Sequence, residues 1–184
     1  MNALVQAHPP FTSDEFYRMA DRGAFAGFRV ELRRGMILKM SPQHVPHARV
    51  KSDLQHALER AIKAAGLGWE VLTEATVSFG GGFEPMADIT VFDPALLGGA
   101  RTIPAAAVKL VVEVSETTLA DDLGEKREDY AEGGLAEYWV ADVQARTVIP
   151  HSQPKDGAYL NEAAPVPISE PLAMLTQPAV SARV

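Results

Sequence analysis

Two carboxylates occur in segments that otherwise have the composition of buried strands. Glu113 interrupts the apolar run 108–115, and Asp88 begins the run 88–92. Because an isolated charge is costly to bury, an acid at such a position is usually paired, hydrogen-bonded or bound to a metal ion. Mg²⁺ favours one or two carboxylates together with water and phosphate oxygens. Asp88 and Glu113 therefore predict a site that holds Mg²⁺ or Mn²⁺ and suits phosphodiester hydrolysis.

A lysine follows the second acid in a segment rich in charge. Beside a metal site, Lys126 could orient or deprotonate the attacking water, or stabilise the charge that develops on the phosphate. Structural interpretations exist for the same residues. Asp88 could cap a loop and Glu113 could be a paired structural acid. Lys126 could pair with Asp122, four residues earlier, in a surface interaction of ~0.3–0.5 kcal/mol. The pattern alone leaves both kinds of interpretation open.

Composition limits the class of protein. The chain has 184 residues, of which 47% are hydrophobic, so a single domain spanning 1–184 is expected. The absence of cysteine excludes thiolate metal sites and a cysteine nucleophile. The net charge of −7 argues against tight non-specific binding of a polyanion, although acids gathered around a metal contribute to that sum.

No segment approaches the roughly 18 apolar residues of a membrane span, and the N-terminus has no signal-peptide pattern. We expect a cytoplasmic protein without membrane association.

Hydrophobic spacing and turn residues predict an α/β (α+β) fold with its core in residues 11–150. A capping residue at Thr12 or Ser13 begins an N-terminal helix, and alternation predicts a hairpin over 28–40. Helical spacing extends over 46–65 and a charged helix over 119–132. Strands are expected at 69–79, 87–92 and 108–114, with a second hairpin at 137–149. Five prolines after Pro150 predict edge structure and loops in the segment 151–184.

Short motifs occur in the order typical of one family. They are Glu31 before Arg33-Arg34-Gly35, His47 at the start of a helix, Met86-Ala87-Asp88, Val112-Glu113-Val114-Ser115, 122–127 and 134–142. With these motifs the chain resembles the Uma-two family over residues 11–149, most specifically over 112–142. Its members are bacterial proteins classed as restriction-endonuclease-like domains of the PD-(D/E)xK nuclease superfamily.

The resemblance implies a restriction-endonuclease-like core, in which a central mixed β-sheet is flanked by helices. It implies that Asp88 and Glu113 are metal ligands as well as catalytic residues. Glu31 would be an accessory acid at the site, and His47 a nearby helix residue that faces it. Lys126 would supply the lysine of the catalytic set.

Two positions depart from the superfamily pattern. Ala87 replaces the proline of its name, which removes some loop rigidity but no ligand. Ser115 stands where the simplest motif has its lysine. In this family the lysine is supplied from the next helix, and Lys126 occupies that place.

These observations predict a metal-dependent endonuclease that hydrolyses DNA phosphodiester bonds. Cleavage of a duplex needs two active sites, which favours a homodimer. The alternative is a non-catalytic nuclease-fold module that binds nucleic acid or a protein partner. A hydrolase for a small phosphorylated metabolite fits the acidic composition but has no recognisable phosphate motif.

Overall fold

The computed structural model describes residues 10–184. The N-terminal segment on which the absence of a targeting signal was predicted lies almost wholly outside the described residues. Within residues 10–184, no helix is both long enough and apolar enough to cross a membrane.

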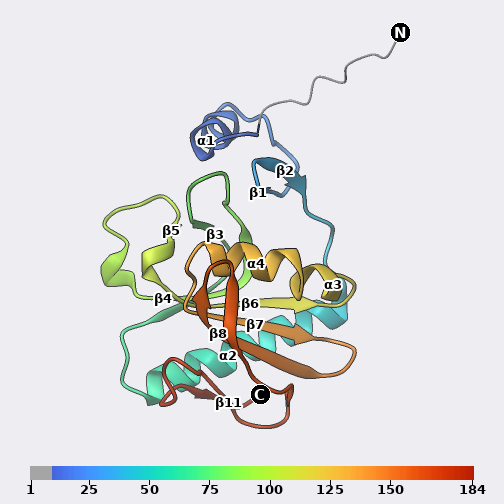
Figure 1. The fold of residues 1–184 in the computed structure, drawn as a ribbon, viewed down its shortest axis with the longest axis vertical. Coiled ribbons are helices and arrows are strands. Elements are labelled where there is room, and N and C mark those ends of the chain that lie inside the picture. The colour runs from blue at the N-terminus through green and yellow to red at the C-terminus, as the bar shows by residue number, and fades with distance from the viewer. Residues whose placement is uncertain (1–9) are drawn as a thin grey trace.

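A mixed eight-stranded sheet forms the centre of the fold (Figure 1). Its strand order is β10-β8-β7-β6-β4-β3-β5, with β9 paired to β8. The pairs β6–β7 and β3–β5 are parallel and the others are antiparallel. The strands are β3 (Glu70–Ser78), β4 (Met86–Phe92), β5 (Ile103–Pro104), β6 (Val108–Ser115), β7 (Glu137–Asp142), β8 (Thr147–Lys155), β9 (Ala158–Glu162) and β10 (Val166–Pro167).

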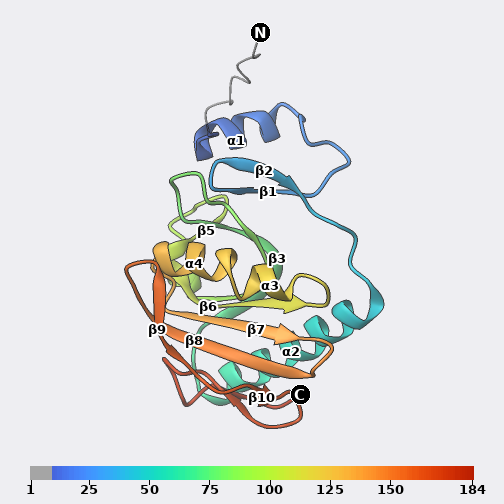
Figure 2. The same cartoon turned by 45° about the vertical axis from the view of Figure 1, so that its right-hand side comes forward.

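Helices cover both faces of this sheet, as the family resemblance implies. The long helix α2 (Val45–Ala64) packs on one face, where Leu54 and Leu58 meet Leu110 and Val112 of β6. The short helices α3 (Leu119–Asp122) and α4 (Glu125–Glu132) lie on the other face (Figure 2). Val111 of β6 belongs to the apolar cluster on the α4 side, so β6 alternates between the two faces.

The N-terminal elements form a unit at one end of the molecule (Figure 1). Helix α1 (Ser13–Asp21) begins with a capping box in which Thr12 and Glu15 satisfy each other's backbone donors. It is followed by the hairpin of β1 (Val30–Arg33) and β2 (Met36–Lys39). Leu32 exchanges two backbone hydrogen bonds with Glu84, which joins the hairpin to the loop before β4.

The helix expected over 119–132 is interrupted at Gly124. A β-carbon at this glycine would lie 2.7 Å from the carbonyl oxygen of Ala120, so the close turn between α3 and α4 requires glycine. The break places Lys126 in the first turn of a separate helix, close to the end of β6.

The proline-rich C-terminal segment supplies edge strands, and it also supplies part of the core. Pro150 lies within β8, between the stretches that pair with β10 and with β9. Beyond these strands, β11 (Leu172–Ala173) and β12 (Ser181–Ala182) form a small sheet. Apolar side chains of this region pack against α2: Ile168, Leu172, Met174, Val180 and Ala182. They were not expected in the core, because their short segments show no periodicity.

Two 3₁₀ helices, η1 (Pro94–Leu96) and η2 (Ala105–Ala107), connect β4 to β5 and β6.

Candidate active site

A cavity of about 550 Å³ opens between the hairpin, the start of α2 and the helices α3 and α4. The five residues singled out in the sequence all line it: Glu31, His47, Asp88, Glu113 and Lys126. They come from β1, α2, β4, β6 and α4. The fold therefore brings together side chains that are far apart in the sequence.

Asp88 is held by donors on both of its oxygens. The Oδ1 atom accepts a hydrogen bond of 3.0 Å from the Gln43 amide, and Oδ2 accepts one of 3.0 Å from the backbone N–H of Val114. His47 Nε2 lies 3.1 Å from Oδ2. Burial alone would raise the pKa of Asp88, but His47, the Val114 N–H and the charge of Lys51 outweigh burial and lower it. Asp88 is thus an ionised, oriented carboxylate.

Glu113 lies next to Asp88 on the neighbouring strand, since Ile89 of β4 pairs with Val112 of β6. The Glu113 side chain is almost fully buried. Its Oε1 accepts a hydrogen bond of 2.7 Å from the Tyr130 hydroxyl and lies 3.0 Å from Lys126 Nζ. Burial raises the pKa of Glu113 to about 8; the Lys126 ammonium opposes this shift, and the negative charge of Asp88 adds to it.

The chemistry available to Lys126 follows from its charge. Burial disfavours its ammonium form, but the negative charges of Glu113, Glu31 and Asp122 outweigh burial and raise the pKa of Lys126. Asp122 lies 3.8 Å away and is fixed by 2.6 Å hydrogen bonds from Ser115 and Thr118. As an ammonium, Lys126 places a positive charge beside Glu113 in the cavity.

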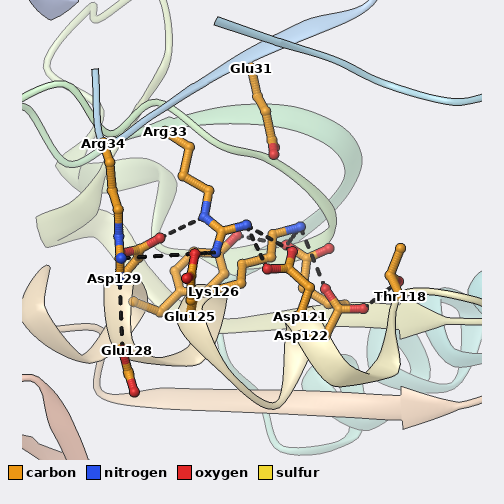
Figure 3. Close-up of polar contacts among 12 residues, drawn as sticks. Glu31, Arg33, Arg34, Thr118, Asp121, Asp122, Glu125, Lys126, Glu128 and Asp129 are labelled. Atoms are coloured by element: carbon orange, nitrogen blue, oxygen red, sulfur yellow. Dashed lines mark hydrogen bonds and ion pairs between the residues drawn. The ribbon is translucent and has the colours of Figure 1, made fainter. Parts of the chain in front are cut away.

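Glu31 is buried in the hairpin. It points toward the helix that carries Lys126 (Figure 3). Its Oε2 accepts a backbone hydrogen bond of 3.3 Å from Met86, two residues before Asp88. The orientation of Glu31 is therefore coupled to the start of the strand that carries Asp88.

A cluster of ion pairs fixes the hairpin over the cavity (Figure 3). The Arg33 guanidinium lies 2.6 Å from Asp129 and 2.7 Å from Asp121, so one buried side chain bridges β1 to both α3 and α4. Arg34 reaches the second oxygen of Asp129 at 2.6 Å. Glu31 precedes Arg33 by two residues on the same strand and the same face. The ion pairs of Arg33 with Asp129 and Asp121 therefore also help to fix the position of Glu31.

The donor set fits a hard divalent cation. Two carboxylates on adjacent strands line the same cavity, and the two charges interact strongly enough for Asp88 to raise the pKa of Glu113. Among residues 10–184, no group of three or more histidine, aspartate or glutamate side chains is arranged to hold a metal ion. Asp88 and Glu113 alone would therefore hold the ion, and water or substrate oxygens would complete the octahedron that Mg²⁺ prefers.

Two neighbours of Asp88 were missed in the sequence. Gln43 lies in the loop before α2, where sequence pattern carries little information. Lys51 lies on α2, four residues after His47, and is 8% exposed. Residues four apart share one face of a helix, so the position of His47 could have identified Lys51.

Comparison with known proteins agrees with this architecture. The structure resembles the crystal structure of "a putative nuclease belonging to DUF820" from Anabaena variabilis, with a TM-score of 0.67 and 16% sequence identity. The alignment covers 91% of this chain and 90% of that chain, so the fold is shared over nearly the full length. No curated protein matches the chain. A family model described as "Putative restriction endonuclease" matches residues 13–182, and the chain therefore belongs to the Uma2 family.

Proposed function

We propose that the protein is a Mg²⁺- or Mn²⁺-dependent endonuclease that hydrolyses DNA phosphodiester bonds at the cavity lined by Asp88 and Glu113. The observation that carries this proposal is the adjacency of the two acids in one cavity, beside a buried lysine that keeps its charge. The family description and the name of the structural neighbour both refer to nucleases, which supports nucleic acid as the substrate.

Each residue has a separate part in this proposal. Asp88 and Glu113 would hold the ion, which, when bound, lowers the pKa of a water molecule and offsets charge on the phosphate. The donors of Gln43, His47 and Val114 keep Asp88 in one orientation, as outer partners of metal ligands commonly do. The Lys126 ammonium would attract the phosphate and stabilise the charge that develops on it.

The test is plasmid nicking in the presence of Mg²⁺ or Mn²⁺. The variants Asp88→Asn and Glu113→Gln each remove a carboxyl ligand, and Lys126→Met removes the ammonium, all with little change in volume. We expect the first two to abolish cleavage and the third to reduce it at least 100-fold, the scale of losing one electrostatic contact to the transition state. Asp53→Asn, an exposed acid of α2, is the matched control and should cleave like the wild type.

Unchanged cleavage by both acid variants would overturn the assignment. If the protein binds DNA without cutting it, and its affinity falls steeply as the salt concentration rises, the alternative is favoured, in which the chain is a non-catalytic nuclease-fold module that binds nucleic acid. Cleavage of a duplex on both strands would need two such sites, so we further propose a homodimer. Light scattering during gel filtration, with and without DNA, measures that state directly.

A further inference from the structure

A third carboxylate lies in line with the two proposed metal ligands. In the β3–β4 ladder Thr73 pairs with Ile89 and Ala75 pairs with Ala87, so Glu74, between them, lies level with Asp88 on the neighbouring strand. Like charges at directly opposed positions of a sheet repel each other. A cation placed close to both carboxyl groups would offset this repulsion.

The backbone is distorted at the same point. Glu74 has φ of 56°, in the left-handed region that side chains other than glycine rarely adopt. Val71 packs on the α2 side of the sheet and Val77 on the α4 side, although strict alternation would place them on the same face. The strand therefore changes face between them, around Glu74. A conformation of this kind is retained where the surrounding contacts impose it, often at functional sites.

Lys51 supplies the compensating charge. Its ammonium lies 2.6 Å from Glu74 Oε1 and 3.7 Å from Asp88 Oδ1, and it donates a hydrogen bond of 2.5 Å to the Gln43 side-chain oxygen. Three oxygens from β3, β4 and the loop before α2 thus surround one buried cation. A divalent metal ion would find the same set of oxygen ligands at this place if the lysine were absent.

We propose that Lys51 is a built-in cation that occupies the second of two neighbouring cation positions, so that the site takes one divalent ion and not two. The inference rests on the proposed function, because it assumes that Asp88 and Glu113 hold an ion. Catalytic sites with two metal ions keep them ~3.5–4 Å apart. Lys51 takes up that space on the Glu74 side of Asp88, and its charge repels a second ion.

Lys51 is accordingly a positioning residue. It touches Asp88 and Gln43 and is not among the residues that line the cavity. The Gln43 amide accepts from Lys51 and donates to Asp88, so the lysine also determines which end of the amide faces the metal ligand.

The experiment is isothermal titration calorimetry of Mn²⁺ alone into the full chain. Electron paramagnetic resonance of Mn²⁺ gives an independent count of the bound ions. The wild type should bind one ion. Lys51→Met should bind two, the second more weakly, because removal of the ammonium leaves Glu74 facing Asp88 across an open position. Lys51→Arg keeps the charge and should bind one. Lys63→Met removes an exposed lysine from the same helix and is the matched control, which should also bind one.

A second substitution locates the additional ion. The double variant Lys51→Met, Glu74→Gln should bind one ion again, because the second position has lost its carboxylate. Circular dichroism confirms that each variant is folded. If Lys51→Met does not fold, Lys51→Gln, which keeps a hydrogen-bonding group, takes its place in the comparison.

The outcomes separate this inference from the proposed function. Two ions in the wild type, or one ion in the folded Lys51→Met variant, would overturn the role of Lys51 and leave the nuclease proposal intact. No ion in the wild type would overturn the metal site itself, and the inference with it.

Discussion

Metal binding to this site should depend strongly on pH, because a proton and the metal compete for Glu113. Burial raises the pKa of Glu113 to about 8. A carboxylate must be deprotonated to act as a ligand, so binding at neutral pH releases a proton. The affinity for Mn²⁺ should therefore rise as pH increases and become constant once pH exceeds the pKa of Glu113.

The size of this effect follows from the pKa. One proton lost per ion bound changes the apparent dissociation constant roughly tenfold per pH unit below the pKa. We therefore expect binding at pH 7 to be about tenfold weaker than at pH 9, and binding at pH 6 about 100-fold weaker. For an ordinary glutamate, which is already ionised at pH 6, the affinity would be nearly constant over this range.

Titration calorimetry with Mn²⁺ at several pH values measures this dependence. Two buffers with different ionisation enthalpies, used at pH 7, report the number of protons released, which should be close to one. In Glu113→Gln, residual binding through Asp88 should lose the pH dependence attributable to Glu113. An affinity that stays constant between pH 6 and pH 8 in the wild type would refute the reasoning.

Three further predictions concern the contacts that hold the site. Arg33→Met should lower the free energy of unfolding by ~2–3 kcal/mol in urea denaturation, because buried Asp129 loses one of its two cationic partners. Tyr130→Phe should cost about 1 kcal/mol in the same measurement, since the Glu113 carboxylate loses a 2.7 Å hydrogen bond. Gly124→Ala should cost ~1–3 kcal/mol and lower the midpoint of thermal unfolding, because the new β-carbon meets a carbonyl oxygen of α3 at 2.7 Å.

Two of these predictions have matched controls within the chain. Arg34→Met removes the more exposed of the two arginines that contact Asp129, and it should cost less than ~1 kcal/mol. Gly68→Ala adds a β-carbon that meets no atom within 4 Å, and it should leave stability nearly unchanged. Equal losses in a variant and its control would contradict the assigned cause.

The principal strands and helices could be predicted because their evidence is local. Short apolar runs marked β4 and β6, and helical spacing marked α2, each to within a few residues of its observed bounds. The division of the charged helix into α3 and α4 depends on how closely Gly124 approaches the preceding turn. That approach is a packing property, and composition does not reveal it.

The sequence by itself determined which residue types were available and that two acids, Asp88 and Glu113, would lie in buried strands. It also determined the family, because its motifs extend over most of the chain. The tertiary structure decided what surrounds those acids. Lys51 reaches Asp88 from a separate helix, and Arg33 fixes the hairpin over the cavity through contacts with residues about 90 positions later. Such contacts depend on how sheet and helices pack, and packing determines the charge of a buried group because it decides which other charges lie beside it.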